Sequence, residues 1–140
     1  EVWVYPLIEK AQELKIPVMF HSEESTFATP WQIGLVAMDF PKVTIIMAHM
    51  GFGLGYTDGA INMAKRASNL ILETTGVVYD IPITKACQVI GSDRIIFGSD
   101  APINNPLHEI KKIQVAKISE EDKRKILGEN IARILGLWGY

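Results

Sequence analysis

Four short apolar runs recur at nearly constant spacing, and they constrain the fold more than any other feature of the chain. Their centres lie 27, 26 and 25 residues apart, in IPVMF (16–20), VTIIMA (43–48), NLILETT (69–75) and RIIFG (94–98). All but the third are nearly continuous in apolar residues, as strands buried on both faces of a parallel sheet are. Each interval leaves room for the crossover helix that a parallel connection needs. The pattern predicts an α/β fold of four strand–helix units.

The segments between these runs carry helix signals. Thr29 and Pro30 are favoured at the N-cap and the first position of a helix, and Ser119 with Asp122 resembles a capping box. Helices are predicted before residue 15 and over 30–40, 57–67, 80–91, 106–117 and 119–137. Because no linker or low-complexity tract interrupts this order, residues 1–140 are predicted to form a single domain.

Charge, hydropathy and cysteine content indicate which partners and which compartment to expect. A net charge of −2 gives no electrostatic reason to expect nucleic acid or an anionic membrane as partner. No apolar run approaches the roughly 18 residues of a membrane span. The single cysteine, Cys87, has no internal partner for a disulfide, so a reducing cytoplasm is the expected location.

Three apolar runs end in side chains that can bind a metal: His21, His49 and Asp100. In parallel α/β folds, ligands bind at the carboxyl ends of the strands. A lone histidine at a strand end is more often structural, and Asp100 alone could cap the following helix. Three such residues at equivalent places in three repeats favour one shared site, where imidazole and carboxylate groups converge on a divalent ion.

The segments that carry this pattern resemble a known family. PVMFHSEES, FPKVTIIMAHMGFG, LILETTG, RIIFGSDAP and ILGENIARILGL are similar to the C-terminal half of the amidohydrolase superfamily. The likeness is closest to the amidohydrolase-related branch that includes carboxymuconate-semialdehyde decarboxylase and small metal-dependent hydrolases. It implies a (β/α)₈ TIM-barrel type, of which this chain carries strands five to eight and the C-terminal helices.

The resemblance also implies roles for the three residues. His21 matches a metal-binding histidine, and His49 matches one that binds a second metal in some members and orients substrate and water in others. Asp100 matches a metal-binding aspartate that also accepts a proton from the metal-bound water. His49 and Asp100 are therefore the expected catalytic residues.

One departure from the family is large. Members begin with a His-x-His pair on their first strand, but the only histidines here are His21, His49 and His108, and His108 is expected on the surface of a helix. A (β/α)₈ barrel also typically needs about 250 residues, against 140 here. Four strands leave two open sheet edges, so we expect a missing N-terminal half or a second copy of the chain to cover them.

The expected function is metal-dependent hydrolysis of a small amide, ester or lactone by a metal-activated water. Zinc is the favoured ion, with manganese as the other candidate. One alternative is non-oxidative decarboxylation of an aromatic or unsaturated acid, although no Arg or Lys clearly stands at the mouth to bind a carboxylate. A second alternative is a non-catalytic half-barrel, because the His-x-His ligands are missing.

Weaker signals each have two interpretations. Glu73 lies in the third predicted strand and has the same parity as Ile71. It either faces the mouth, where it would contact a ligand residue or the substrate, or makes a structural ion pair, which is slightly favoured. Ser22, Glu23 and Glu24 either orient the His21 ring or are merely solvated. The glycine-rich stretch 51–55 fails the fingerprints of nucleotide-binding loops and is expected to form a flexible loop over the site.

Overall fold

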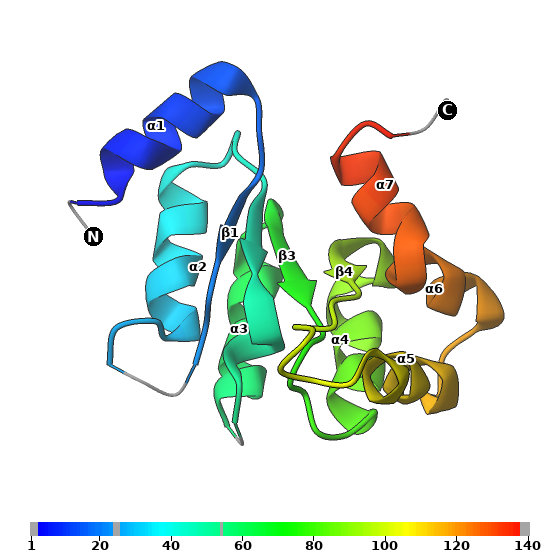
Figure 1. The fold of residues 1–140 in the computed structure, drawn as a ribbon. Helices are drawn as coiled ribbons and strands as arrows, with labels where there is room; N and C mark the ends of the chain where they lie inside the picture. Colours follow the sequence, from blue (N-terminus) through cyan, green and yellow to red (C-terminus); the bar gives the residue numbers. More distant parts are fainter. Residues whose placement is uncertain (1–2, 24–25, 54, 138–140) are drawn as a thin grey trace.

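The computed structural model describes residues 3–23, 26–53 and 55–137. Its centre is a parallel sheet in the order β1-β2-β3-β4 (Figure 1). The strands are β1 (Val18–Phe20), β2 (Ile45–Met47), β3 (Leu70–Glu73) and β4 (Ile95–Ile96). The predicted α/β class with four parallel strands is confirmed, and the structure shows that the strands lie in chain order.

The strands are shorter than the apolar runs that predicted them. Before β4, Ser92–Arg94 forms the 3₁₀ helix η2. After it, the Phe97 N–H donates to the Ile126 carbonyl at 2.9 Å, instead of to a neighbouring strand. The backbone therefore leaves the sheet early and turns towards the C-terminal helices.

The helices lie where the capping signals predict them. Thr29 and Gln32 form a capping box at the start of α2, and Ser119 and Asp122 form one at the start of α6. The helices are α1 (Tyr5–Leu14), α2 (Pro30–Asp39), α3 (Tyr56–Arg66), α4 (Ile81–Ile90), α5 (Pro106–Val115), α6 (Glu120–Arg124) and α7 (Asn130–Ile134). A π-helical turn, η3 (Lys125–Glu129), joins α6 to α7.

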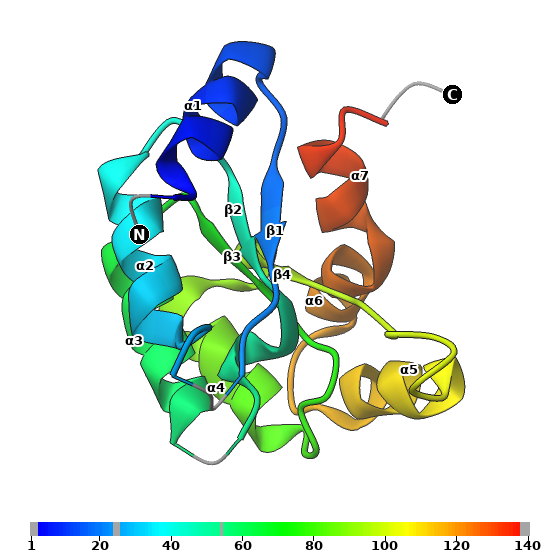
Figure 2. The same ribbon diagram turned by 60° about the vertical axis from the view of Figure 1, so that its left-hand side comes forward.

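Helices cover both faces of the sheet (Figures 1 and 2). Figure 2 shows α1, α2 and α3 on one side of the strands and α6 and α7 on the other. Strand residues of one parity, such as Ile45 and Leu70, join the main apolar core, whereas those of the other parity pack with α7. This second cluster is small and consists of Ile46, Ile71 and Ile96 with Ile131 and Ile134. On the same face, Met19 of the edge strand β1 remains 56 % exposed.

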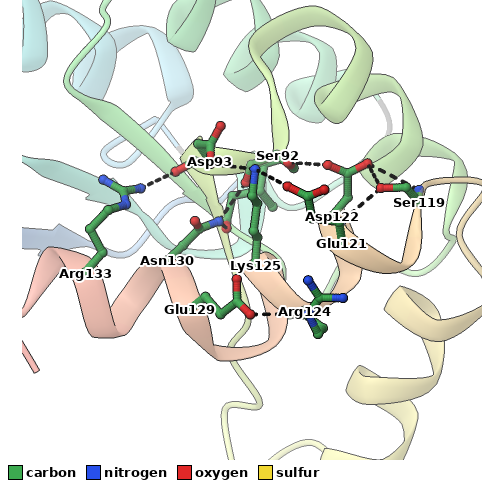
Figure 3. Close-up of polar contacts among 11 residues, drawn as sticks. Ser92, Asp93, Ser119, Glu121, Asp122, Arg124, Lys125, Glu129, Asn130 and Arg133 are labelled. Atoms are coloured by element: carbon green, nitrogen blue, oxygen red, sulfur yellow. Dashed lines mark hydrogen bonds and ion pairs between the residues drawn. The ribbon is translucent and has the colours of Figure 1, made fainter. Parts of the chain in front are cut away.

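Polar side chains fasten the C-terminal helices to the start of β4 (Figure 3). The buried Asn130 amide donates to the carbonyls of Ser92 at 2.7 Å and Ile95 at 2.8 Å. Arg133 donates to the Asp93 carbonyl, and Lys125 pairs with the Asp93 carboxylate at 3.2 Å. These contacts fix the strand that leads to Asp100.

Within the described ranges, no helix combines the length and the apolar character that crossing a membrane requires.

Candidate metal-binding site

The carboxyl ends of the four strands open into one cavity of about 510 Å³. His21 follows β1 directly, His49 lies in the 3₁₀ turn η1 (Ala48–Gly51) after β2, and Glu73 ends β3. Asp100 lies in the loop after β4, and all four side chains line the cavity. A second cavity of about 180 Å³ is also lined by His21, His49 and Asp100. The three residues predicted to share a site therefore do gather at the same end of the sheet.

The two imidazoles lie side by side. The ring centroids of His21 and His49 are 4.8 Å apart, with the ring planes at 72°. The His21 side chain is 61 % exposed, and its Nε2 lies 3.7 Å from a carboxylate oxygen of Glu23. Two adjacent imidazoles can share one ion, because each metal–nitrogen bond is only about 2.0–2.1 Å long.

Asp100 begins an exposed loop and does not cap the next helix. Its φ of 51° is left-handed, a conformation that aspartate adopts more readily than most residues. Its carbonyl accepts the N–H groups of Ile103 and Asn104 at 2.9 and 3.2 Å, which closes a turn directly after it. The cap of α5 is Asn105, whose side chain accepts the Leu107 N–H at 3.0 Å. The helix-cap alternative for Asp100 is therefore excluded.

His49 sits in a strained turn. His49 and Met50 are consecutive non-glycine residues with left-handed φ values of 65° and 45°. Each such residue costs on the order of 1–3 kcal/mol and persists only where its surroundings enforce it. Met50 is fully buried, which anchors one side of the turn.

Two buried polar side chains from the neighbouring strands hold this turn. Ser22, after β1, donates to the Ala48 carbonyl and accepts the Gly51 N–H at 2.8 Å. Glu73, at the end of β3, accepts the His49 N–H at 3.0 Å. Ser22 was expected to orient the His21 ring or to be solvated, whereas it fixes the backbone of η1. Glu24 lies outside the described residues.

Glu73 is a buried carboxylate without an ion-pair partner among the described residues. The residue is 4 % exposed, and its oxygens accept the N–H of His49 and both the N–H and the hydroxyl of Thr75. The predicted structural ion pair is thus absent from the described part of the chain. The signal that could have identified it is its parity on β3, which directs it to the same face as Ile71 and the cavity.

The glycine-rich stretch after β2 partly covers His49. The ring of Phe52 lies 6.2 Å from that of His49, at 74°. A Cβ at Gly76 would come within 2.9 Å of the Phe52 ring, so the glycine makes room for it. Leu54 of this stretch lies outside the described residues. His108, as expected, is exposed and lines neither cavity.

The donor chemistry of the site fits a divalent metal, but the shell is incomplete. Two imidazoles with a nearby carboxylate suit zinc or manganese. Among residues 3–23, 26–53 and 55–137, no three His, Cys, Asp or Glu side chains are arranged to hold an ion. His21 and His49 come together, and Asp100 shares their cavities without joining such a group. The described lining of both cavities contains no Lys or Arg.

Comparison with known proteins adds to this geometry. Residues 1–137 match the amidohydrolase family. The chain belongs to this family. Gamma-resorcylate decarboxylase of Polaromonas sp. is 32 % identical over 105 residues, which cover 62 % of this chain and 32 % of the relative. The Rhizobium enzyme of the same name is 30 % identical over 119 residues, 72 % of this chain and 36 % of the relative.

Solved structures confirm the barrel-type fold. A TIM-barrel protein from Bordetella bronchiseptica superposes with a TM-score of 0.81 at 24 % identity, over 98 % of this chain and 51 % of that one. A dihydroxybenzoic acid decarboxylase from Polaromonas sp., with bound manganese and the inhibitor 2-nitroresorcinol, gives 0.73 at 23 % identity, over 94 % and 53 %. The chain thus spans about a third of these curated relatives and about half of these solved structures.

These comparisons correct one prediction and leave another without support. The predicted hydrolase is wrong, since the curated relatives are decarboxylases and support the alternative. One set of metal-binding donors is compatible with either reaction, because a metal can polarise a substrate oxygen as well as a water. The preference for zinc has no such support, since two of the similar solved decarboxylases contain bound manganese.

Proposed function

We propose that this chain forms part of the active site of a metal-dependent decarboxylase that acts on a hydroxylated benzoic acid. The observation that carries the proposal is the relationship to gamma-resorcylate decarboxylases at 30–32 % identity. The cavity at the strand ends supports it, because His21, His49 and Asp100 all line it. A reducing cytoplasm remains our proposal for the location, on the basis of the single cysteine.

In this proposal, His21 and His49 hold a divalent ion, with manganese as the first candidate. When bound, the ion supplies a Lewis acid for the oxygens of the substrate. Decarboxylation breaks the bond between the ring and the carboxylate carbon, releases CO₂ and leaves the electron pair on the ring carbon. A proton must then reach that carbon. Asp100 is the candidate for moving it, because its side chain lines the cavity, can carry a proton and is not assigned to the ion. His49 acts as a ligand in this proposal, since an imidazole nitrogen that binds a metal does not carry a proton.

A non-catalytic role for this chain by itself is the second candidate. The described residues contain no three-ligand group, and the chain spans only part of its relatives. We propose that the remaining ligands come from a missing N-terminal half or from a second copy of the chain. Whether the remaining ligands come from an N-terminal half or from a second copy, the proposed substrate of the complete site is a small organic acid.

The test is an assay of the full encoded protein, loaded with Mn²⁺, for release of CO₂ from 2,6-dihydroxybenzoate. We expect turnover, with losses of about 10²–10⁴-fold in His49→Ala and Asp100→Asn. The matched control is His108→Ala, which removes an exposed histidine outside both cavities and should retain full activity. A protein that binds Mn²⁺ without releasing CO₂ would support the non-catalytic role, and equal losses in all three variants would refute the assignment of residues.

A further inference from the structure

We propose that Glu73 is a positioning residue that holds His49 in the left-handed turn at the mouth of the cavity. The carboxylate does so through the backbone of His49 and does not bind the ion itself. The hydrogen-bond part of the inference is independent of the reaction, whereas its effect on metal binding rests on the proposed function.

The first step is that the turn needs external support. His49 and Met50 both have positive φ without being glycine, which is a costly conformation. The turn has its own backbone hydrogen bond from the Phe52 N–H to the His49 carbonyl at 2.9 Å, but this bond leaves the His49 N–H to a partner outside the turn. The His49 N–H points to the Glu73 carboxylate, at 3.0 Å. A hydrogen bond to an ionised acceptor is about twice as strong as a neutral one, so this contact is well suited to hold a strained turn.

The second step is that both oxygens of the Glu73 carboxylate accept hydrogen bonds from the protein. One oxygen accepts the His49 N–H, and the other accepts the Thr75 N–H at 2.7 Å together with the Thr75 hydroxyl. Glu73 is only 4 % exposed, so these three donors replace the water molecules that would solvate an exposed carboxylate. A carboxylate so bound on both oxygens acts on the site through the groups that it holds.

The third step is that the chain just after β4 leaves room for this carboxylate. A Cβ at Gly98 would lie 2.0 Å from a Glu73 oxygen and 2.6 Å from the Thr75 hydroxyl. The absence of a side chain at Gly98 therefore gives Glu73 its place between β4 and the turn of His49. Ser22 holds the opposite side of the same turn, so His49 is fixed from both neighbouring strands.

The direct test is an NMR measurement of the His49 amide in the full protein without metal. Glu73→Gln keeps the shape, and its one amide oxygen is expected to stay with the two Thr75 donors, which directs the NH₂ group at the His49 N–H. We expect the His49 amide resonance to move upfield and its hydrogen exchange to accelerate at least tenfold. Thr75→Val, which removes only the hydroxyl donor to Glu73, is the milder variant and should produce a smaller shift in the same direction if Glu73→Gln does not fold.

The control is Asn69→Ala at the other end of β3. The Asn69 amide donates to the carbonyls of Ala37, Phe40 and Val43, so its loss also destabilises the fold, but away from the cavity. This control separates positioning from a general loss of stability. A His49 amide that responds equally to Asn69→Ala and Glu73→Gln, or to neither, would overturn the inference.

Titration with Mn²⁺ provides the second readout. We expect Glu73→Gln to weaken Mn²⁺ binding 10–100-fold, as the loss of a group that orients a metal ligand does. Asn69→Ala should retain wild-type affinity. If the His49 amide responds as expected but the wild-type protein neither binds Mn²⁺ nor releases CO₂, the positioning role stands and the proposed function fails. If the protein is active but Glu73→Gln leaves both the amide and the affinity unchanged, the positioning role fails alone.

Discussion

The His49 turn shows how much of the site depends on single residues that carry no metal-binding signal. His21, His49 and Asp100 could be predicted because histidine and aspartate stand out after apolar runs. Ser22 could not, since its hydroxyl acts on the backbone of a turn 26 residues away and that turn's positive φ values have no signature in the sequence. The position of Glu73 could be predicted in part, because its parity placed it on the correct face of the sheet. Its hydrogen-bond partners could not be predicted from that parity.

Ser22→Ala should destabilise the protein measurably. The hydroxyl is fully buried and makes two hydrogen bonds to η1, so its loss leaves a carbonyl and an N–H of that turn without this partner. We expect a decrease of about 1–3 kcal/mol in the free energy of unfolding, measured by urea denaturation. Ser99→Ala removes only a 3.4 Å contact to the Ala101 N–H and should cost less than about 0.5 kcal/mol. Equal effects of the two substitutions would contradict this account of the turn.

At the scale of elements, the C-terminal helices determine where β4 ends. The apolar run at 94–98 predicted a longer strand, but Phe97 bonds to Ile126 of η3 and the sheet pairing stops at Ile96. A contact between residues 29 positions apart depends on tertiary packing, so the run alone could not reveal it. The caps at Thr29 and Ser119, by contrast, depend on residues within one helical turn and were predicted correctly.

Of two substitutions in the hydrogen-bond network of Figure 3, Asn130→Ala should destabilise the protein more than Arg133→Ala. Its amide satisfies two carbonyls at the start of β4 while only 2 % exposed. Leaving those buried carbonyls unsatisfied should lower the free energy of unfolding by about 1–3 kcal/mol, as measured by thermal and urea denaturation. The exposed Arg133 bonds to a single carbonyl, and Arg133→Ala should change stability by less than half as much.

The capping box of α6 should make stability depend on acid pH. Hydrogen bonds from Ser119 and then from Ser92 lower the pKa of Asp122 below its ordinary value of 3.8. A lowered folded-state pKa gives stability that is present above the ordinary value and is lost as the pH falls through the lower one. Asp122→Asn should therefore reduce the melting temperature at pH 7, by a few °C, and the gap from wild type should close as the pH falls through the lowered pKa of Asp122. A gap that persists unchanged in acid would show that the charge of Asp122 plays no part.

For the whole molecule, the apolar runs and their even spacing were enough to predict four parallel strands joined by helices, whereas their order in the sheet comes from the structure. The reaction could not be predicted in the same way, because one set of donors can serve hydrolysis or decarboxylation. An Arg or Lys at the mouth would have favoured decarboxylation, but the sequence shows no clear candidate there. The described cavity lining has neither, yet the curated relatives are decarboxylases, and a bound divalent ion would supply the positive charge that a carboxylate needs.

The open edge at β1 should promote self-association of the 140-residue chain. β1 pairs only with β2 among the described strands, and Met19 on it is 56 % exposed. Unpaired apolar edges are templates for further pairing, whereas a charged residue on the edge opposes it. Analytical ultracentrifugation should show species heavier than 15.6 kDa that increase with concentration, and Met19→Lys should reduce them. A monomer at every concentration would refute the idea that this edge needs covering.

The central claim is that His21 and His49 bind one metal ion between them at the carboxyl ends of the strands. Anomalous diffraction at the manganese edge, from crystals of the full protein soaked in MnCl₂, tests it most directly. We predict a single strong peak within bonding distance of a ring nitrogen of both His21 and His49, on the side of the cavity that Asp100 lines. A fully loaded crystal whose manganese peaks all lie away from these two rings would contradict the account.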